Sequence, residues 1–237
     1  MSGHSKWSTI KHKKAIEDNK RGKIFTKLVK AIEIAAREGG PDMSINFKLR
    51  LCVDKAKQAN MPKNNIDRAI EKGSGEGGGD VLSEMIYEGY GQSNVAVIIE
   101  VVTDNKNRTA SEIKQILDRS GGSLGQTGSV GFLFDRRGRI LIQKEANPDD
   151  QMLELIDLGV LDVVAGEDLI EVLVEPSKLY EVKTQLDSKY KVVEAELAYL
   201  PKNPIEIEEE SKEKVVNFLN SLDDMDDVLK VYSNVKL

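Results

Sequence analysis

The first third of the chain has apolar residues at the period of an α-helix. Between residues 22 and 38 they share one helix face, at Ile24, Leu28, Ala31, Ile32 and Ala35. A Gly-Gly-Pro sequence then ends this helix. Two further amphipathic stretches follow, at 44–59 and after Pro62, where Asn60 and Pro62 are typical of a helix start. The pattern predicts a small helical bundle.

The clearest break in the sequence is GSGEGGGD, at residues 73–80. Its glycine content predicts a flexible linker. Gly73, Gly75 and Gly78 match the spacing of a dinucleotide-binding loop, but such a loop must leave a strand and open a helix. This segment follows a helix and precedes a strand, so we exclude a nucleotide site here.

Beyond residue 80 the apolar pattern becomes that of β-strands. Segments 83–90 and 94–103 predict two strands, and the second is apolar enough to be buried on both faces. A helix at 107–120 and a short strand at 129–134 follow, and the sequence DRRGR is expected to turn the chain. The next elements are predicted as strand 139–144, helix 149–158, strands 161–165 and 169–175, helix 177–189 and strand 191–199.

That succession is β-α-β-β-α-β, the split βαβ arrangement. The C-terminal segment supplies one helix and one strand, which complete the unit begun at residue 83. We therefore predict an α+β fold with an N-terminal helical bundle and two α/β (ferredoxin-like, split βαβ) domains, one inserted in the other. The predicted domains are 1–79, 80–135 with 204–237, and the inserted 136–203. Separate sequential units are the alternative.

The charge of the chain is unevenly distributed. Residues 1–72 hold 17 Lys and Arg against 8 Asp and Glu, a net +9, and the remainder holds 17 against 32, a net −15. A basic segment on an acidic body favours a polyanionic partner for the segment. A solvated basic face without a partner is the alternative, and charge alone does not separate DNA from RNA.

The residue inventory argues against catalysis and cofactors. Both histidines, His4 and His12, lie in the basic arm, the N-terminal segment that begins with GHSKWSTIKHKK at residues 3–14, so no Ser-His-Asp set is possible elsewhere in the chain. They lack the neighbours of a zinc site, and Cys52 lies on the inward face of a helix. Residues 223–227 lack the spacing of a calcium loop, and we interpret them as a solvated acidic turn. We predict a protein that is not an enzyme and has no cofactor and no metal.

The basic arm carries the strongest candidate site. Its lysines and arginine could neutralise several phosphates, Trp7 could stack on an unpaired base or ribose, and His12 could add a polar contact. Trp7 could instead attach the arm to the bundle. A second basic pair follows a predicted strand in TDNKNRT, at a helix start where Asn107 is the expected cap. The predicted nucleic-acid-binding residues are Lys6, Trp7, Lys11, His12, Lys13, Lys14, Lys20, Arg21, Lys23, Lys27, Lys106 and Arg108.

Several of these segments resemble the YebC/PmpR family along essentially the whole chain. The similar segments are GHSKWSTIKHKK, KRGKIFTKL, PKNNIDRAI, YEGYG, TDNKNRT and KVYSNV. The resemblance implies three domains, with one α/β domain inserted in another, and a cytoplasmic, probable transcriptional regulator that binds DNA. It also implies a relationship to mitochondrial translational activators and to factors that relieve ribosome stalling at proline-rich segments.

Two functions therefore remain open at the level of sequence. The first is a DNA-binding regulator of transcription, and the second is a translation factor that binds ribosomal or transfer RNA on the ribosome. The chain has no plain helix-turn-helix signal and no dimer-forming heptads, which weakens the first because sequence-specific repressors often bind as dimers. We expect a cytoplasmic monomer without a membrane span.

Overall fold

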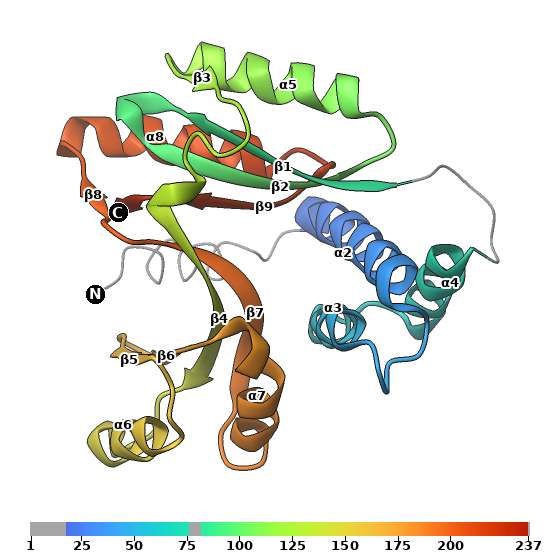
Figure 1. Ribbon diagram of the computed structural model, residues 1–237, viewed down its shortest axis with the longest axis vertical. Helices are drawn as coiled ribbons and strands as arrows, with labels where there is room; N and C mark the ends of the chain where they lie inside the picture. The colour runs from blue at the N-terminus through green and yellow to red at the C-terminus, as the bar shows by residue number, and fades with distance from the viewer. Residues whose placement is uncertain (1–17, 76–81, 237) are drawn as a thin grey trace.

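The computed structural model describes residues 18–75 and 82–236, which form a mixed α+β protein (Figure 1). The helical region consists of α2 (Asp18–Gly39), α3 (Phe47–Gln58) and α4 (Lys63–Ser74). Their apolar faces meet in one core, which includes Ile32, Leu49 and Ile66. The sequence prediction of three amphipathic helices at these positions is confirmed.

Asn46 fixes the entry into α3. Its Oδ1 accepts a hydrogen bond from the Leu49 amide at 3.0 Å, and its Nδ2 donates to the carbonyl oxygens of Ala35 and Gly40, both at 2.7 Å. The predicted role of Asn60 as a helix cap is wrong. Asn60 has a φ of 59° and lies in the turn after α3, and no side chain of the described residues caps α4.

The predicted linker begins later than expected, because Gly73 belongs to α4. A Cβ added at Gly73 would lie 2.4 Å from the Glu33 carbonyl oxygen, so the missing side chain allows α4 to approach α2 closely. Gly75, with a φ of 92°, then ends α4 in the left-handed conformation. The rest of the predicted linker, residues 76–81, lies outside the described residues.

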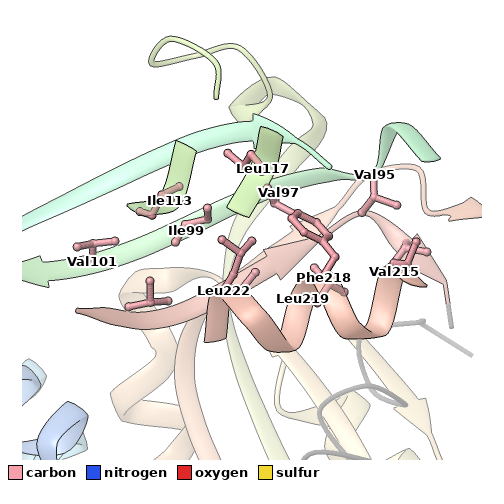
Figure 2. Close-up of a cluster of buried hydrophobic side chains, with 13 residues drawn as sticks. Val95, Val97, Ile99, Val101, Ile113, Leu117, Val215, Phe218, Leu219 and Leu222 are labelled. Atoms are coloured by element: carbon pink, nitrogen blue, oxygen red, sulfur yellow. The ribbon is translucent and has the colours of Figure 1, made fainter. Parts of the chain in front are cut away.

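The first sheet has the strand order β3-β1-β2-β9. Its strands are β1 (Ser83–Tyr90), β2 (Ala96–Thr103), β3 (Ser123–Leu124) and β9 (Val228–Ser233). Helices α5 (Lys106–Arg119) and α8 (Glu209–Asp223) cover one face, and Figure 2 shows their side chains pointing toward those of β2. β2 is buried on both faces as predicted, since Ala96 and Ile98 belong to a second cluster on the opposite side.

The second sheet lies at the other end of the molecule and has the order β5-β6-β4-β7 (Figure 1). Its strands are β4 (Phe134–Gln143), β5 (Asp162–Ala165), β6 (Leu169–Val174) and β7 (Val192–Pro201). Helices α6 (Pro148–Asp157) and α7 (Leu179–Asp187) complete the β-α-β-β-α-β succession that the sequence predicted.

The connection between the sheets corrects two predictions. Residues 131–133 form a short 3-10 helix instead of a strand, and the DRRGR sequence does not turn the chain. Phe134–Gln143 is one continuous strand, and it pairs with β7 from Phe134 opposite Pro201 to Ile142 opposite Val192. A two-stranded antiparallel ribbon therefore leads into the second sheet.

The C-terminal segment returns to the first sheet, where β9 pairs antiparallel with β2. A small parallel pair, β8 (Ile205–Glu206) with β10 (Val235–Lys236), lies beside it. The first sheet does not follow the predicted split βαβ order, because β1 and β2 form a direct hairpin before α5. The exact domain bounds stay a prediction.

Candidate nucleic-acid interface

The predicted site residues divide into three groups. Six of them, Lys6, Trp7, Lys11, His12, Lys13 and Lys14, lie outside the described residues. Lys20 and Arg21 lie in the first turn of α2, where only the backbone is described. The remaining four, Lys23, Lys27, Lys106 and Arg108, have described surroundings, and three of these carry ion pairs.

A row of lysines on α2 contacts the acidic turn after α8. The Lys23 ammonium lies 3.2 Å from the Asp224 carbonyl oxygen and 3.8 Å from its Oδ1. Lys27 donates to the Asp223 carbonyl oxygen and lies 3.5 Å from Asp223 Oδ1. The helical repeat of these lysines matches one face of α2, so the face that was predicted to meet a polyanion lies against acidic groups of the same chain.

Lys30 extends this row to Asp227, the most enclosed residue of the turn. Its Nζ lies 2.6 Å from Asp227 Oδ1 and 3.0 Å from the Asp226 carbonyl oxygen. The interpretation of residues 223–227 as a solvated acidic turn is therefore wrong for Asp227, which is only 7% exposed. The turn, which directly precedes β9, therefore links the helical region to the first sheet through its ion pair with Lys30.

The Asp227 carboxylate accepts hydrogen bonds from residues of α2, β2 and α5. Besides Lys30, its Oδ2 accepts hydrogen bonds from Thr109 at 2.6 Å, Arg108 at 3.0 Å and Thr103 at 3.1 Å. Burial alone would raise the pKa of the Asp227 carboxyl group, but the hydrogen bonds from Lys30, Thr109 and Arg108 together hold that pKa well below its ordinary value. The carboxylate stays charged at neutral pH.

A pocket of about 430 Å³ opens beside this contact, between the helical region and the start of α5. It is lined by Phe25, Thr26, Val29, Lys30, Glu33, Lys72, Leu82, Asp104, Arg108 and Asp227. Lys72 pairs with the buried Glu33 at 3.1 Å. The charged residues of the wall thus already have partners of opposite sign, and the pocket offers little uncompensated charge to a ligand.

The start of α5 differs from the prediction in its cap. Asn105, rather than Asn107, caps this helix, because Asn105 Oδ1 accepts from the Arg108 amide at 3.1 Å. The Arg108 guanidinium pairs with Asp104 at 2.8 Å as well as with Asp227. Lys106 is exposed, and its carbonyl oxygen accepts a hydrogen bond from the Tyr87 hydroxyl at 3.2 Å. Of this pair, Lys106 is the better placed to meet an anion from outside.

Three exposed basic residues of α3 and α4 were not among the predicted site residues. Lys57, Lys63 and Arg68 are exposed and lie at the end of α3 and on α4. Lys63 opens α4, whose first amides have no side-chain cap and could meet a phosphate. The PKNNIDRAI segment contained the signal, namely a basic residue directly after a helix-starting proline.

A second ion-pair cluster joins α3 to the second sheet. Lys55 Nζ lies 2.8 Å from Glu194 Oε1 and 2.6 Å from Glu196 Oε2 on β7. Lys230 of β9 also pairs with Glu196, and burial together with the charge of Lys55 lowers the pKa of Lys230. Three parts of the fold therefore meet at one strand.

The described residues show little that could support metal or thiol chemistry. Within 18–75 and 82–236, no three His, Cys, Asp or Glu side chains are grouped to hold a metal ion. Cys52 packs partly buried against the helical core, and burial raises the pKa of its thiol, which keeps it protonated. In the same part of the chain, no helix has the length and apolarity that crossing a bilayer requires.

These observations define a class: an α+β protein in which a helical region is held by ion pairs against two sheets. Two family models match it, the TACO1/YebC protein N-terminal domain at residues 5–76 and the TACO1/YebC second and third domain at residues 82–235. The chain belongs to the TACO1/YebC family. This is a family of probable transcriptional regulators and not of enzymes.

Relatives of known sequence and structure agree with this assignment. A probable transcriptional regulatory protein of Thermoanaerobacter pseudethanolicus is 50% identical, with 100% of this chain and 98% of that protein aligned. The probable transcriptional regulatory protein YrbC of Bacillus subtilis is 47% identical, with 100% of both chains aligned. The crystal structure of a conserved hypothetical protein from Aquifex aeolicus has a TM-score of 0.86 and 41% identity, covering 92% of this chain and 91% of its own.

Proposed function

We propose that this protein is a DNA-binding regulator of transcription in the cytoplasm that acts without catalysis and contacts nucleic acid through its basic N-terminal domain. The observation that carries the proposal is the charge split, +9 over residues 1–72 against −15 over the rest. A basic segment on an acidic body concentrates attraction for a polyanion at one end and limits it elsewhere. Relatives named as probable transcriptional regulatory proteins support the same function.

Within that domain we assign the main contacts to the arm. Lys23 and Lys27 lie against the acidic turn, so part of their charge is compensated within the chain. Lys6, Lys11, Lys13 and Lys14 precede them in sequence, and each phosphate neutralised by such a residue releases condensed counterions. We propose the domain bounds predicted from the sequence, with residues 1–79 as the nucleic-acid-facing unit.

A second candidate function rests on Trp7. A tryptophan among lysines is suited to unpaired bases, which folded RNA exposes and duplex DNA does not. This favours a translation factor that binds ribosomal or transfer RNA on the ribosome and assists synthesis of proline-rich segments. The two functions share the arm and differ in the nucleic acid that it meets.

The arm is tested by replacing Lys11, Lys13 and Lys14 with Ala in the full chain. We expect the slope of log affinity against log salt for duplex DNA to become shallower by about 2.7, or about 0.9 for each lost phosphate contact. The matched control replaces Lys114, Lys212 and Lys236, three lysines of the acidic part, and should leave the slope unchanged. Equal slopes in both triple variants would show that the lysines of the arm do not contact the DNA phosphates.

Crosslinking in cells followed by sequencing separates the two functions. Discrete upstream DNA bound by the intact chain, and lost in the arm variant, supports the transcriptional function. Enrichment of ribosomal or transfer RNA instead supports the second candidate. A variant with Trp7 replaced by Ala should lose more affinity for single-stranded RNA than for duplex DNA if the indole stacks on bases.

A further inference from the structure

Helix α6 exposes large aliphatic side chains to solvent. Leu153 is 62% exposed and Ile156 is 55% exposed, and their spacing of three residues places them on one face of the helix. Leu158 and Leu161 continue the apolar surface after the helix, at 39% and 48% exposure. Leu155 is fully buried, so it is this residue that faces the core. Leu153 and Ile156 therefore form a second apolar face of the helix that the core does not cover.

The segment that carries these apolar residues is acidic. Residues 145–177 contain ten Asp and Glu and no Lys or Arg. Asp149 and Asp157 lie four residues before and after Leu153, on the same side of α6, and both are exposed. Among the described residues, cations from other segments compensate three of these carboxylates: Lys189 pairs with Glu154, Arg137 with Glu175 and Arg139 with the buried Glu171. The α6 surface (Leu153, Ile156, Leu158 and Leu161 with this acidic rim) therefore combines apolar area with one sign of charge.

We infer that the α6 surface is a docking site for a basic amphipathic helix of another protein. Contiguous exposed apolar residues with a polar rim are typical of interaction sites. An incoming helix would place its apolar face on Leu153 and Ile156, and its lysines or arginines would meet the acidic rim. In Figure 1, α6 lies at the end of the molecule away from α2 and the first sheet, where a partner can approach it.

The negative charge of the α6 surface disfavours other binding partners. Nucleic acid and anionic membrane surfaces would both be repelled by the exposed carboxylates beside Leu153, such as Asp149 and Asp157. A second copy of this chain would make a two-fold contact that sets the same acidic rim against itself. The inference does not rest on the proposed function, because the basic arm and the α6 surface lie in different parts of the sequence.

The test uses the full chain and a synthetic helical peptide with leucines at positions i, i+3, i+4 and i+7 and lysines elsewhere. NMR shifts should map binding to α6, and a matched peptide with glutamates in place of lysines should bind far more weakly. Replacing Leu153 and Ile156 with Ser should lower the affinity about tenfold or more, as loss of central apolar contacts does at interfaces. Phe132, which is 64% exposed near the other sheet, provides the matched control Phe132→Ser and should leave affinity unchanged.

Three results would overturn the inference. Shifts could map outside α6, the Phe132→Ser and the Leu153/Ile156 variants could bind equally, or sedimentation could show self-association that the Leu153/Ile156 variant abolishes. A photo-crosslinking residue at position 153 tests the same point in cells, with position 132 as reference. Basic segments with a helical apolar period should be captured at 153. Capture of nucleic acid, of this chain itself, or of nothing above the reference level would count against the inference.

Discussion

Replacing Asp227 with Asn should destabilise the contact between the helical region and the first sheet. Asp227 Oδ1 accepts from Lys30, and Oδ2 accepts from Thr103, Thr109 and Arg108. An amide offers one acceptor oxygen and directs its NH₂ group at the remaining donors. The substitution therefore removes a charge and also leaves at least one donor without a partner.

The expected loss follows from burial. Removing one partner of a fully buried ion pair costs about 3–5 kcal/mol. The Lys30 and Arg108 side chains keep 19% and 45% exposure, so water partly replaces the lost carboxylate. We expect a loss of about 2–3 kcal/mol, between the values for a buried and a surface pair. In a chain of this size that corresponds to a fall in melting temperature of about 4–12 °C.

The assay is urea and thermal unfolding followed by circular dichroism, with Asp226→Asn as the control. Asp226 is exposed and contacts Lys30 only through its backbone carbonyl, so this variant removes the same charge without the same contacts. Lys30→Ala should add little in the Asp227→Asn background, because its partner is already lost. If the two Asn variants differ by less than about 0.5 kcal/mol, the turn is only a solvated surface.

The pH dependence follows from the lowered pKa of Asp227. Because that pKa is lowered on folding, the stabilisation is fully present above the ordinary carboxyl pKa of about 4, and it is lost as the pH falls further. The difference in stability between the wild-type chain and Asp227→Asn should thus be constant from pH 7 to pH 5 and shrink toward pH 3. Glu88→Gln should cost about 1–3 kcal/mol in urea unfolding, because both carboxylate oxygens of Glu88 accept backbone amides, at Gly128, Val130 and Gly131. Gly73→Ala should cost about 1–3 kcal/mol through its contact with the Glu33 carbonyl, whereas Gly22→Ala, with open space around it in α2, should gain up to about 1 kcal/mol. Equal melting temperatures for these two alanine variants would contradict the close approach of α4 to α2.

Local periodicity predicted the elements of this fold well, because each helix and most strands bury one regular face. The second half of the long strand β4 was predicted, as strand 139–144, but its first half was predicted as a turn. Gly138 and its arginine neighbours are typical of a turn, yet Gly138 lies within the strand. Glycine is needed at this position because an added Cβ would lie 2.6 Å from Val174 Cγ2. Arg139 is buried on the same strand, 3.2 Å from Glu194. From the sequence alone, a glycine needed for close packing and an arginine needed for a buried ion pair look the same as turn residues. Only the fold shows that Val174 and Glu194 lie beside them.

The candidate site was harder to predict for a related reason. A sequence shows that α2 is basic and that residues 223–227 are acidic, but the two lie about 200 positions apart, as in the Lys23 to Asp224 contact. Pairing between distant segments depends on the fold that brings them together. The charge of an isolated segment therefore overstates what it can offer to an external partner.

The basic residues of the N-terminal domain therefore serve two different purposes. In the described helical region, five lysines pair with acidic side chains of the two sheets and their connections: Lys23, Lys27, Lys30, Lys48 and Lys55. Part of the charge asymmetry thus holds the helical region in place and would do so without nucleic acid. What remains of the helical domain for a polyanion includes the arm and the exposed Lys57, Lys63 and Arg68, and outside that domain the exposed Lys106 is also accessible. Salt weakens both uses of charge. Binding must therefore be compared between variants within the range of ionic strength over which the Asp227 contact stays intact, so that loss of an interface is not mistaken for undocking of the domain that carries it.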